Sequence, residues 1–280
     1  MENNFYIKYG NNPEFSLPEF SLKDITSNLT LLKLDENPSI SNVYQNNVMQ
    51  DGEMWNYTTY QPTTVSCTFL LWFSTWQDYL LAKHDIMQAF MQKELFRIRT
   101  DIDKHLVRYV RTAPFTIAPN EDGSHWATFT VAFENPSGVK YSYLRSDQIS
   151  QSNGWGYGLN LADVPNLNYH FNNQTSFRIF NASDIAVDPY FQKHDLKITI
   201  KSANGGLTVK NTTNETSWTF KGSLNSNDTV VLDGINTYKN NSYDSMETDF
   251  GYIKLEKGWN EITLDKVADI TFSFPFIYTF

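Results

Sequence analysis

The sequence predicts a mainly β protein of two domains, an N-terminal β-sandwich-like domain with one α-helix and a C-terminal β-sandwich. Aromatic residues make up 15% of the 280 residues, and aromatic side chains favour the half-buried surface of a pleated sheet. Only one segment has a clear helical period. The second half consists of short alternating segments separated by turn signals roughly every ten residues, as in a sandwich.

A polar, glycine-rich stretch divides the chain. Residues 146–153 lack any hydrophobic period, and residues 154–158 contain three glycines ahead of Val164-Pro165-Asn166. Such composition is typical of a linker or an exposed loop. We therefore expect an N-terminal domain over residues 1–147, a linker over 148–168 and a C-terminal domain over 169–280.

The N-terminal domain opens with predicted strands. Residues 4–10 predict an opening strand that ends at a Gly-Asn-Asn turn, and residues 29–34 predict a second strand that stops at Asp35–Pro38. An Asp51-Gly52 turn then leads into a run with Trp55, Tyr57 and Tyr60. The strand around Cys67 is apolar on both faces, which is expected of a buried central strand.

One helix follows, with Ser74 or Thr75 as its N-cap. Apolar residues recur at steps of three and four, which predicts a stripe against the sheet and a polar outer face. The predicted stripe is Trp76, Tyr79, Leu80, Lys83, Ile86, Met87 and Phe90, and the predicted outer residues are Gln77, Asp78, His84, Asp85 and Gln88.

After the helix the period changes to two. Residues 95–99 and 106–111 flank Asp101-Ile102-Asp103 and predict a hairpin. Residues 126–133 and 139–143 predict another strand pair around an Asn-Pro-Ser-Gly turn.

The second domain is almost purely β. The last six residues are too apolar to be solvated, so we expect them to pack on this chain or a neighbour. The predicted strands are 197–201, 207–210, 217–221, 229–232, 252–255, 259–264 and 270–274.

Charge and cysteine content exclude several functions. The net charge of −9 argues against a basic surface that recognises a nucleic-acid sequence. It is compatible with a channel wall that DNA passes without binding. Cys67 is the single cysteine, which excludes an internal disulfide. No signal peptide or membrane span is predicted, so we expect synthesis in a cytoplasm and no membrane partner.

No catalytic pattern is found. The chain has no Gly-x-Ser-x-Gly element, and its five histidines are scattered without metal-ligand spacing. The carboxylate pairs Asp101/Asp103 and Glu121/Asp122 fall at predicted turns, where solvated side chains do not acquire the raised pKa of a general acid. We therefore expect no enzyme activity, no cofactor and no metal.

A carbohydrate-binding function is the alternative. His170-Phe171-Asn172 is similar to the start of a galectin sugar motif, but Gln174 replaces its Arg, and Thr263 replaces the Arg after Trp259. Aromatic faces can still stack on a pyranose. The candidate glycan or partner contacts are Trp155, Tyr157, His170, Asn172 and Trp259.

Two features together resemble a known family. The first runs from Asp51-Gly52 through the Cys67 strand and the helix to the arginine-rich hairpin. The second is the block 181–189, which opens a sandwich containing residues 197–200 and Trp218. The chain resembles the distal tail proteins of siphoviruses that infect Gram-positive bacteria.

This resemblance implies a virion protein at the tail tip. Its N-terminal domain would form a hexameric ring that joins the tail-tube protein to the tail-associated baseplate protein, with DNA passing through the lumen. Its C-terminal domain would be galectin-like and would dock a receptor-binding protein or touch a host-surface glycan. A ring needs heterologous contacts, for which strand edges and Arg97, Arg99, Arg108 and Arg111 are the candidates.

Overall fold

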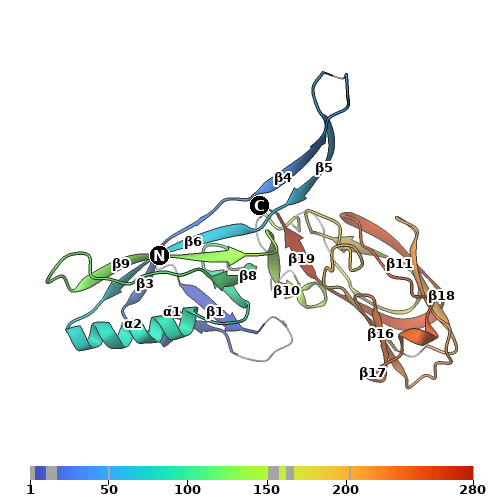
Figure 1. Ribbon diagram of the computed structural model, residues 1–280. Helices are drawn as coiled ribbons and strands as arrows, with labels where there is room; N and C mark the ends of the chain where they lie inside the picture. Colours follow the sequence, from blue (N-terminus) through green and yellow to red (C-terminus); the bar gives the residue numbers. More distant parts are fainter. Residues whose placement is uncertain are drawn as a thin grey trace. The chain divides into compact units, whose positions relative to one another are not determined.

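The computed structural model describes residues 4–10, 18–49, 51–150, 158–161, 167–201 and 203–279. The chain forms two compact units, unit 1 over residues 1–140 with 279–280, and unit 2 over residues 141–278 (Figure 1). Both consist mainly of strands, which confirms the predicted fold class. The division falls at Lys140/Tyr141, whereas the sequence placed the end of the first domain at residue 147. Much of the expected linker, including residues 151–157, lies outside the described residues.

Unit 1 is built on one antiparallel sheet with the strand order β2-β1-β7-β8-β9-β6-β3. The predicted opening strand, the buried Cys67 strand and the hairpin around Asp101–Asp103 are all present. Its strands are β1 (Phe5–Tyr9), β2 (Phe20–Ser21), β3 (Leu29–Glu36), β6 (Thr63–Trp72), β7 (Phe96–Thr100), β8 (Leu106–Thr112) and β9 (Trp126–Asn135).

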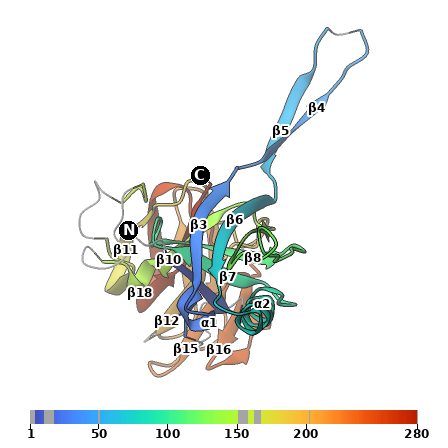
Figure 2. The same ribbon diagram turned by 90° about the vertical axis from the view of Figure 1, so that its left-hand side faces the viewer.

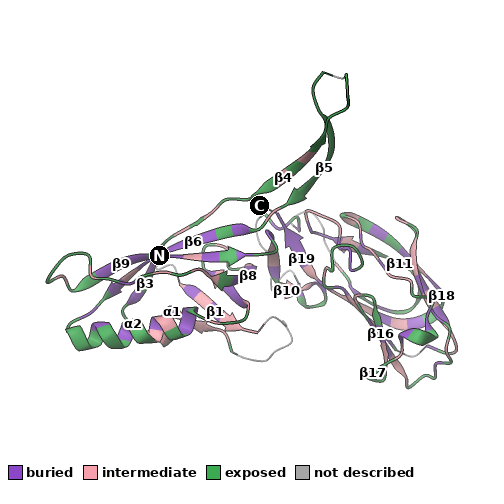
Figure 3. Ribbon diagram, viewed as in Figure 1, coloured by how far each residue is buried: buried purple, intermediate pink, exposed green. Residues whose placement is uncertain are grey.

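The core of unit 1 is aromatic. Phe69 of β6 packs against Phe5, Phe90 and Phe129 with ring centroids 5.4–5.6 Å apart. Residues on β6 alternate strictly, so Val65, Cys67, Phe69 and Leu71 are buried while their neighbours are partly or fully exposed (Figure 3). The expectation that both faces of β6 are buried is therefore wrong: one face carries the core.

Helix α2 (Trp76–Phe90) covers this core, and α1 (Leu22–Ile25) is a single short turn. Thr75 is the N-cap, since its hydroxyl accepts the Asp78 N–H at 3.1 Å and the Asp78 carboxylate accepts the Thr75 N–H at 3.0 Å. The predicted stripe is partly wrong, because Trp76 and Leu80 are exposed. The buried face is Tyr79, Ala82, Ile86, Ala89 and Phe90, so two alanines that the predicted stripe omitted face the core.

The strands predicted around the Asn-Pro-Ser-Gly turn are both present but do not pair with each other. β9 pairs with β6 along its whole length, and β10 (Lys140–Arg145) pairs with β19. The turn itself is closed by a Gly138 N–H to Asn135 C=O bond of 3.2 Å. The predicted pairing is wrong because strands that are adjacent in sequence can each pair with distant strands.

Unit 2 has a sheet of order β14-β13-β18-β12-β15-β16-β17, with β11 also on β18. The strands predicted over residues 259–264 and 270–274 form one long strand, β18, which ends at Ser273. Residues 252–255 form only an isolated bridge from Leu255 to Val187, so the predicted strand there is wrong. The strands are β11 (His170–Asn181), β12 (Lys197–Lys201), β13 (Leu207–Asn211), β14 (Thr216–Phe220), β15 (Thr229–Asp233), β16 (Asn236–Lys239), β17 (Ser242–Tyr243), β18 (Gly258–Ser273) and β19 (Pro275–Tyr278).

The apolar end of the chain packs on unit 2. Phe276 and Tyr278 of β19 are buried, and the Tyr278 hydroxyl donates to the Leu159 carbonyl at 2.9 Å. Phe274 and Phe276 both contact the Tyr169 ring. The expectation that this segment packs on the chain instead of extending into solvent is confirmed.

One-sided burial of β6 predicts unequal effects of neighbouring truncations. Phe69→Ala should lower the free energy of unfolding by about 3–5 kcal/mol, because it leaves a cavity among three aromatic rings. Leu70→Ala, on the other face of the same strand, should cost clearly less. Urea unfolding of both variants measures this, and equal losses would contradict the one-sided core.

Candidate functional site

The most unusual surface of unit 1 is a free-standing β-hairpin. Strands β4 (Ile40–Gln45) and β5 (Met54–Tyr60) pair only with each other and form a separate two-stranded sheet. Figures 1 and 2 show it extending away from the rest of the unit, beyond β3 and β6. Every described residue from 44 to 60 is exposed.

This hairpin carries little charge and many large apolar side chains although it is solvated on both faces. Its only charged residues are Asp51 and Glu53. The internal polar contacts are few, among them a Thr58 hydroxyl to Asn42 Oδ1 bond of 2.6 Å. We call residues 40–60 the hairpin arm. Its exposed large apolar side chains are Ile40, Tyr44, Val48, Met49, Met54, Trp55, Tyr57 and Tyr60.

A second apolar patch lies at the other end of β6. Trp72 and Trp126 are in register across β6 and β9, with ring centroids 6.2 Å apart, and both are exposed. Trp76, Leu80 and Leu81 of α2 are exposed as well, but α2 covers the opposite face of the sheet, which carries the core. We call Trp72 and Trp126 the tryptophan patch. Because β6 rises about 3.3 Å per residue, the patch lies roughly 30 Å from the root of the arm.

Three of the four arginines proposed for a ring interface form ion pairs within unit 1, and the fourth bonds a backbone carbonyl. Arg97 and Arg99 both bind Glu19, at 2.9 and 2.6 Å. Arg108 is 2% exposed and binds Asp103 at 2.7 Å and Glu36 at 2.8 Å. Arg111 is exposed and donates to the Lys93 carbonyl at 3.4 Å. Their role between copies stays a prediction.

Arg108, Asp103, Glu36 and Lys140 form an ion-pair cluster at the root of the hairpin arm, which we call the Arg108 cluster. Glu36 ends β3, immediately before the chain enters the arm, and it also binds Lys140 at 3.1 Å. Removing one member would leave buried charge without compensation. The cluster therefore fixes the strand from which the arm departs.

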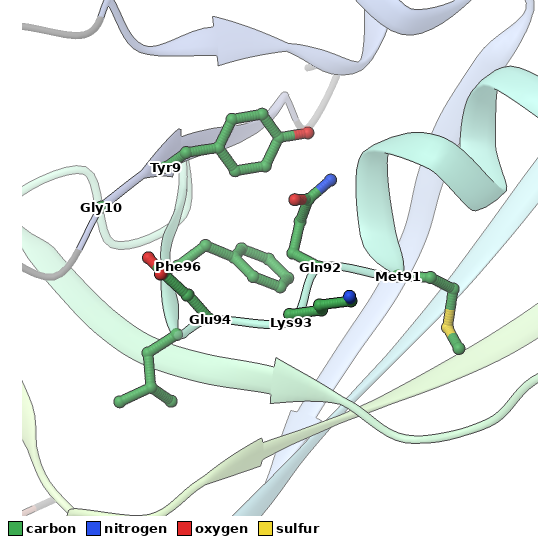
Figure 4. A pocket seen from close by; sticks show the side chains of 8 residues that line it. Tyr9, Gly10, Met91, Gln92, Lys93, Glu94 and Phe96 are labelled. Carbon is green, nitrogen blue, oxygen red and sulfur yellow. The ribbon is translucent and has the colours of Figure 1, made fainter.

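A shallow pocket of 430 Å³ lies beyond the C-terminal end of α2, where β1 ends and β7 begins (Figure 4). Side chains of Tyr9, Gln92 and Phe96 come together there, and the Tyr9 hydroxyl donates to the Ala89 carbonyl at 3.0 Å. Burial raises the pKa of Tyr9. The charged residues that line the pocket are Lys93 and Glu94. The lining contains no Ser, Cys or Thr nucleophile beside a base, so it offers no catalytic pair.

The remaining chemical candidates have structural roles. Asp101 accepts from the Asn4 amide at 2.9 Å, while Asp103 belongs to the Arg108 cluster. Burial raises the pKa of the Cys67 thiol to about 12, which keeps it protonated and unreactive. Among the described residues, no group of three or more His, Cys, Asp or Glu side chains is arranged to hold a metal.

The three predicted glycan contacts that the structure describes are not brought to one place. His170 and Asn172 lie at one end of the β11–β18 pair, and Trp259 lies at the other, opposite Phe180, roughly 30 Å along the strand. His170 binds Asp269 at 2.7 Å. The Arg178 guanidinium lies over the Trp259 ring, 4.6 Å from its centroid. Trp155 and Tyr157 lie outside the described residues.

Two family models match the chain. Residues 18–135 match a phage tail protein RIFT-related domain, and residues 155–274 match a phage tail C-terminal domain. The chain is a phage tail protein. These matches, with the fold similarities below, confirm the resemblance to siphovirus distal tail proteins that the sequence indicated.

Solved structures share this tail protein's fold. One is the crystal structure of the SPP1 Dit (gp 19.1) protein, described as a paradigm of the hub adsorption apparatus in phages that infect Gram-positive bacteria. It has 10% sequence identity and a TM-score of 0.69, covering 97% of this chain and 99% of that one. Another is the phage P2 baseplate in its activated conformation with Ca, with 11% identity, a TM-score of 0.54 and 100% of both chains covered. No curated protein matches the sequence.

No helix in the described part of this tail protein is long and apolar enough to cross a membrane.

The feature that sequence reasoning missed is the free-standing arm. Its signal was present, since the segment combines aromatic residues on both faces with only two charges.

The Arg108 cluster generates a stability prediction. Arg108→Met should lower the free energy of unfolding by about 3–5 kcal/mol, because Glu36 and Asp103 would keep buried or half-buried negative charge. Arg111→Met, at an exposed arginine on the same strand, should change it by less than about 0.5 kcal/mol. Chemical unfolding of the two variants compares them, and a mild Arg108→Met effect would contradict the structural role of the cluster.

Burial of Cys67 predicts slow thiol chemistry. At pH 8 the native protein should react negligibly with a thiol reagent such as DTNB, whereas one equivalent should react in denaturant. The folded-state pKa of about 12 lies above the value of an exposed thiol, so protection persists as the pH rises through 9. Rapid native labelling at pH 8 would show that the β6 core opens.

Proposed function

We propose that this protein forms a ring, hexameric by the family resemblance, at the distal end of a siphovirus tail. Unit 1 builds the ring, which connects the tail tube to the tail-associated baseplate protein and serves as a hub for host-adsorption proteins. The protein is made in the host cytoplasm and ends in the virion tail tip. It acts without catalysis and needs no cofactor.

The hairpin arm carries this proposal. A two-stranded hairpin without a third strand or a packed face is at best marginally stable in water. The arm has no such support, and it exposes eight large apolar side chains. Contiguous exposed apolar surface marks a protein interface. The arm is therefore expected to be covered by another copy in the assembled state.

The tryptophan patch supplies a second, different surface. A closed ring requires head-to-tail contacts in which one patch meets another patch on the next copy. The arm and the tryptophan patch lie at opposite ends of β6, which suits such a contact. An arm that docked on its own equivalent would instead give a two-fold dimer.

The charge of the chain fits the same role. A net charge of −9 repels the phosphates of DNA, which favours passage through a lumen without binding. The fold of an SPP1 hub protein and of a P2 baseplate chain supports a place in the tail assembly.

Light scattering of the purified full chain tests the ring. The expected mass is about six times the 32.4 kDa of one chain, and negative-stain images should show an open central hole. Tyr57→Lys places a charge on the exposed arm, so it should reduce the mass towards that of one chain without loss of folding.

Tyr243→Lys is the matched control. Tyr243 is an exposed tyrosine of unit 2, 61% accessible, and its variant should assemble like the unmodified chain. A ring that persists with Tyr57→Lys would contradict the role of the arm. A chain that remains monomeric over the accessible concentration range would contradict the ring itself.

A further inference from the structure

Unit 2 contains an aromatic cleft to which the ring proposal gives no role. Three segments far apart in sequence form it: the loop before β12, the turn between β13 and β14, and the loop after residue 247. The hollow measures 520 Å³, within the usual range of small-ligand sites. We define the aromatic cleft by Tyr190, Phe191, Glu215, Phe250 and Tyr252.

Its rings are displayed to solvent. Tyr190, Phe191 and Phe250 are 52%, 72% and 68% exposed. Tyr190 and Tyr252 lie nearly parallel, with centroids 4.9 Å apart and an interplanar angle of 15°. Phe191 stands edge-on to Tyr190 at 4.8 Å. The three contacting rings offer flat and edge surfaces beside one another.

Hydrogen bonds fix the backbone that presents these rings. On one side the buried Asp188 carboxylate accepts the N–H groups of Tyr190 and Phe191, both at 2.9 Å. On the other side the Thr248 hydroxyl accepts the Phe250 N–H at 3.1 Å. Because the backbone is held before a ligand arrives, binding costs less conformational entropy.

Backbone geometry fixes the second loop further. Phe250 has φ of +59°, a conformation that costs free energy for a bulky residue and is found where structure serves function. Gly251 lies so close to β14 that a Cβ there would be 2.1 Å from the Ser217 carbonyl oxygen. The Asp249 carboxylate bonds both Gly251 N–H and Thr219 N–H, at 2.9 and 3.0 Å.

The polar part of the lining is acidic and hydroxylated. Glu215 is its only charged side chain, and Thr216 and Ser217 lie beside it. Glu215 bonds Lys210 at 2.5 Å and remains largely exposed. A carboxylate accepts hydroxyl donors strongly, but it repels an anionic polymer. The cleft thus combines flat apolar rings with an acceptor for hydroxyl groups.

We propose that the aromatic cleft binds a neutral pyranose glycan. A pyranose has an apolar C–H face, which stacks on an aromatic ring, and a rim of hydroxyls, which donate to a carboxylate. Tyr190 and Tyr252 supply the stacking surface, and Phe191 and Phe250 flank it. The Glu215 carboxylate accepts hydrogen bonds from the sugar hydroxyls. The site differs from the residues that the sequence suggested for sugar binding, and it does not depend on the ring.

Saturation-transfer NMR and calorimetry on the full chain test this site. The probe is a panel of neutral oligosaccharides of glucose, galactose, N-acetylglucosamine and rhamnose. At least one should bind with a dissociation constant on the order of a millimolar or below. Tyr190→Ala should weaken that binding about tenfold, and Glu215→Gln about threefold or more.

Two controls keep the result interpretable. Phe191→Ala removes the most exposed ring of the cleft, so it should weaken binding even if Tyr190→Ala perturbs folding. Tyr243→Ala removes an exposed tyrosine elsewhere on unit 2 and should leave binding unchanged. The proposal is overturned if no panel member binds, or if Tyr190→Ala and Phe191→Ala both bind like the unmodified chain. Salt-sensitive binding of an anionic wall polymer in place of neutral sugars would overturn it as well.

Discussion

The hairpin arm imposes the constraint on which the rest of unit 1 depends. Its two strands satisfy each other's backbone groups, but they bury almost no side-chain surface. The hydrophobic contribution that normally offsets the entropy of ordering a chain is therefore missing within one copy. In the proposed ring, the partner surface of the arm belongs to another copy of the chain. The remainder of unit 1 is arranged to hold it: β3 and β6 flank its root, and the Arg108 cluster joins the last residue of β3 to β8.

Rigid support and exposed aromatic surface recur in both units. In unit 1 the aromatic core around Phe69 holds β6 between the arm and the tryptophan patch. In unit 2 carboxylate and hydroxyl groups bond the backbone of the loops that display Tyr190 and Phe250. In each case buried polar or aromatic contacts fix the backbone, and large rings remain accessible. This division suits a protein whose work is recognition and assembly, because pre-ordered surfaces lose less entropy when they bind.

Local patterns in the sequence were sufficient for most of the fold. A continuous apolar run located the strand around Cys67, alternation located the strand around Ile198, and the Ser74/Thr75 cap signal located the start of α2. Pairing was harder, because it depends on contacts between distant segments: β10 joins β19 rather than its neighbour β9. The helix stripe failed where Ala82 and Ala89, rather than larger residues, face the sheet. The arginines looked like an exposed face, since nothing in the local sequence shows that Glu19 and Glu36 return to bind them. The aromatic cleft could not be anticipated, as its three segments meet only in the folded chain.

Amide hydrogen exchange over residues 40–60 tests the central claim most directly. The measurement compares the assembled protein with the dissociated Tyr57→Lys variant. If the arm is covered by a neighbouring copy, its amides should exchange at least tenfold more slowly in the assembly. Equally fast exchange of the arm in both states, with the assembly intact, would show that the ring is held together elsewhere.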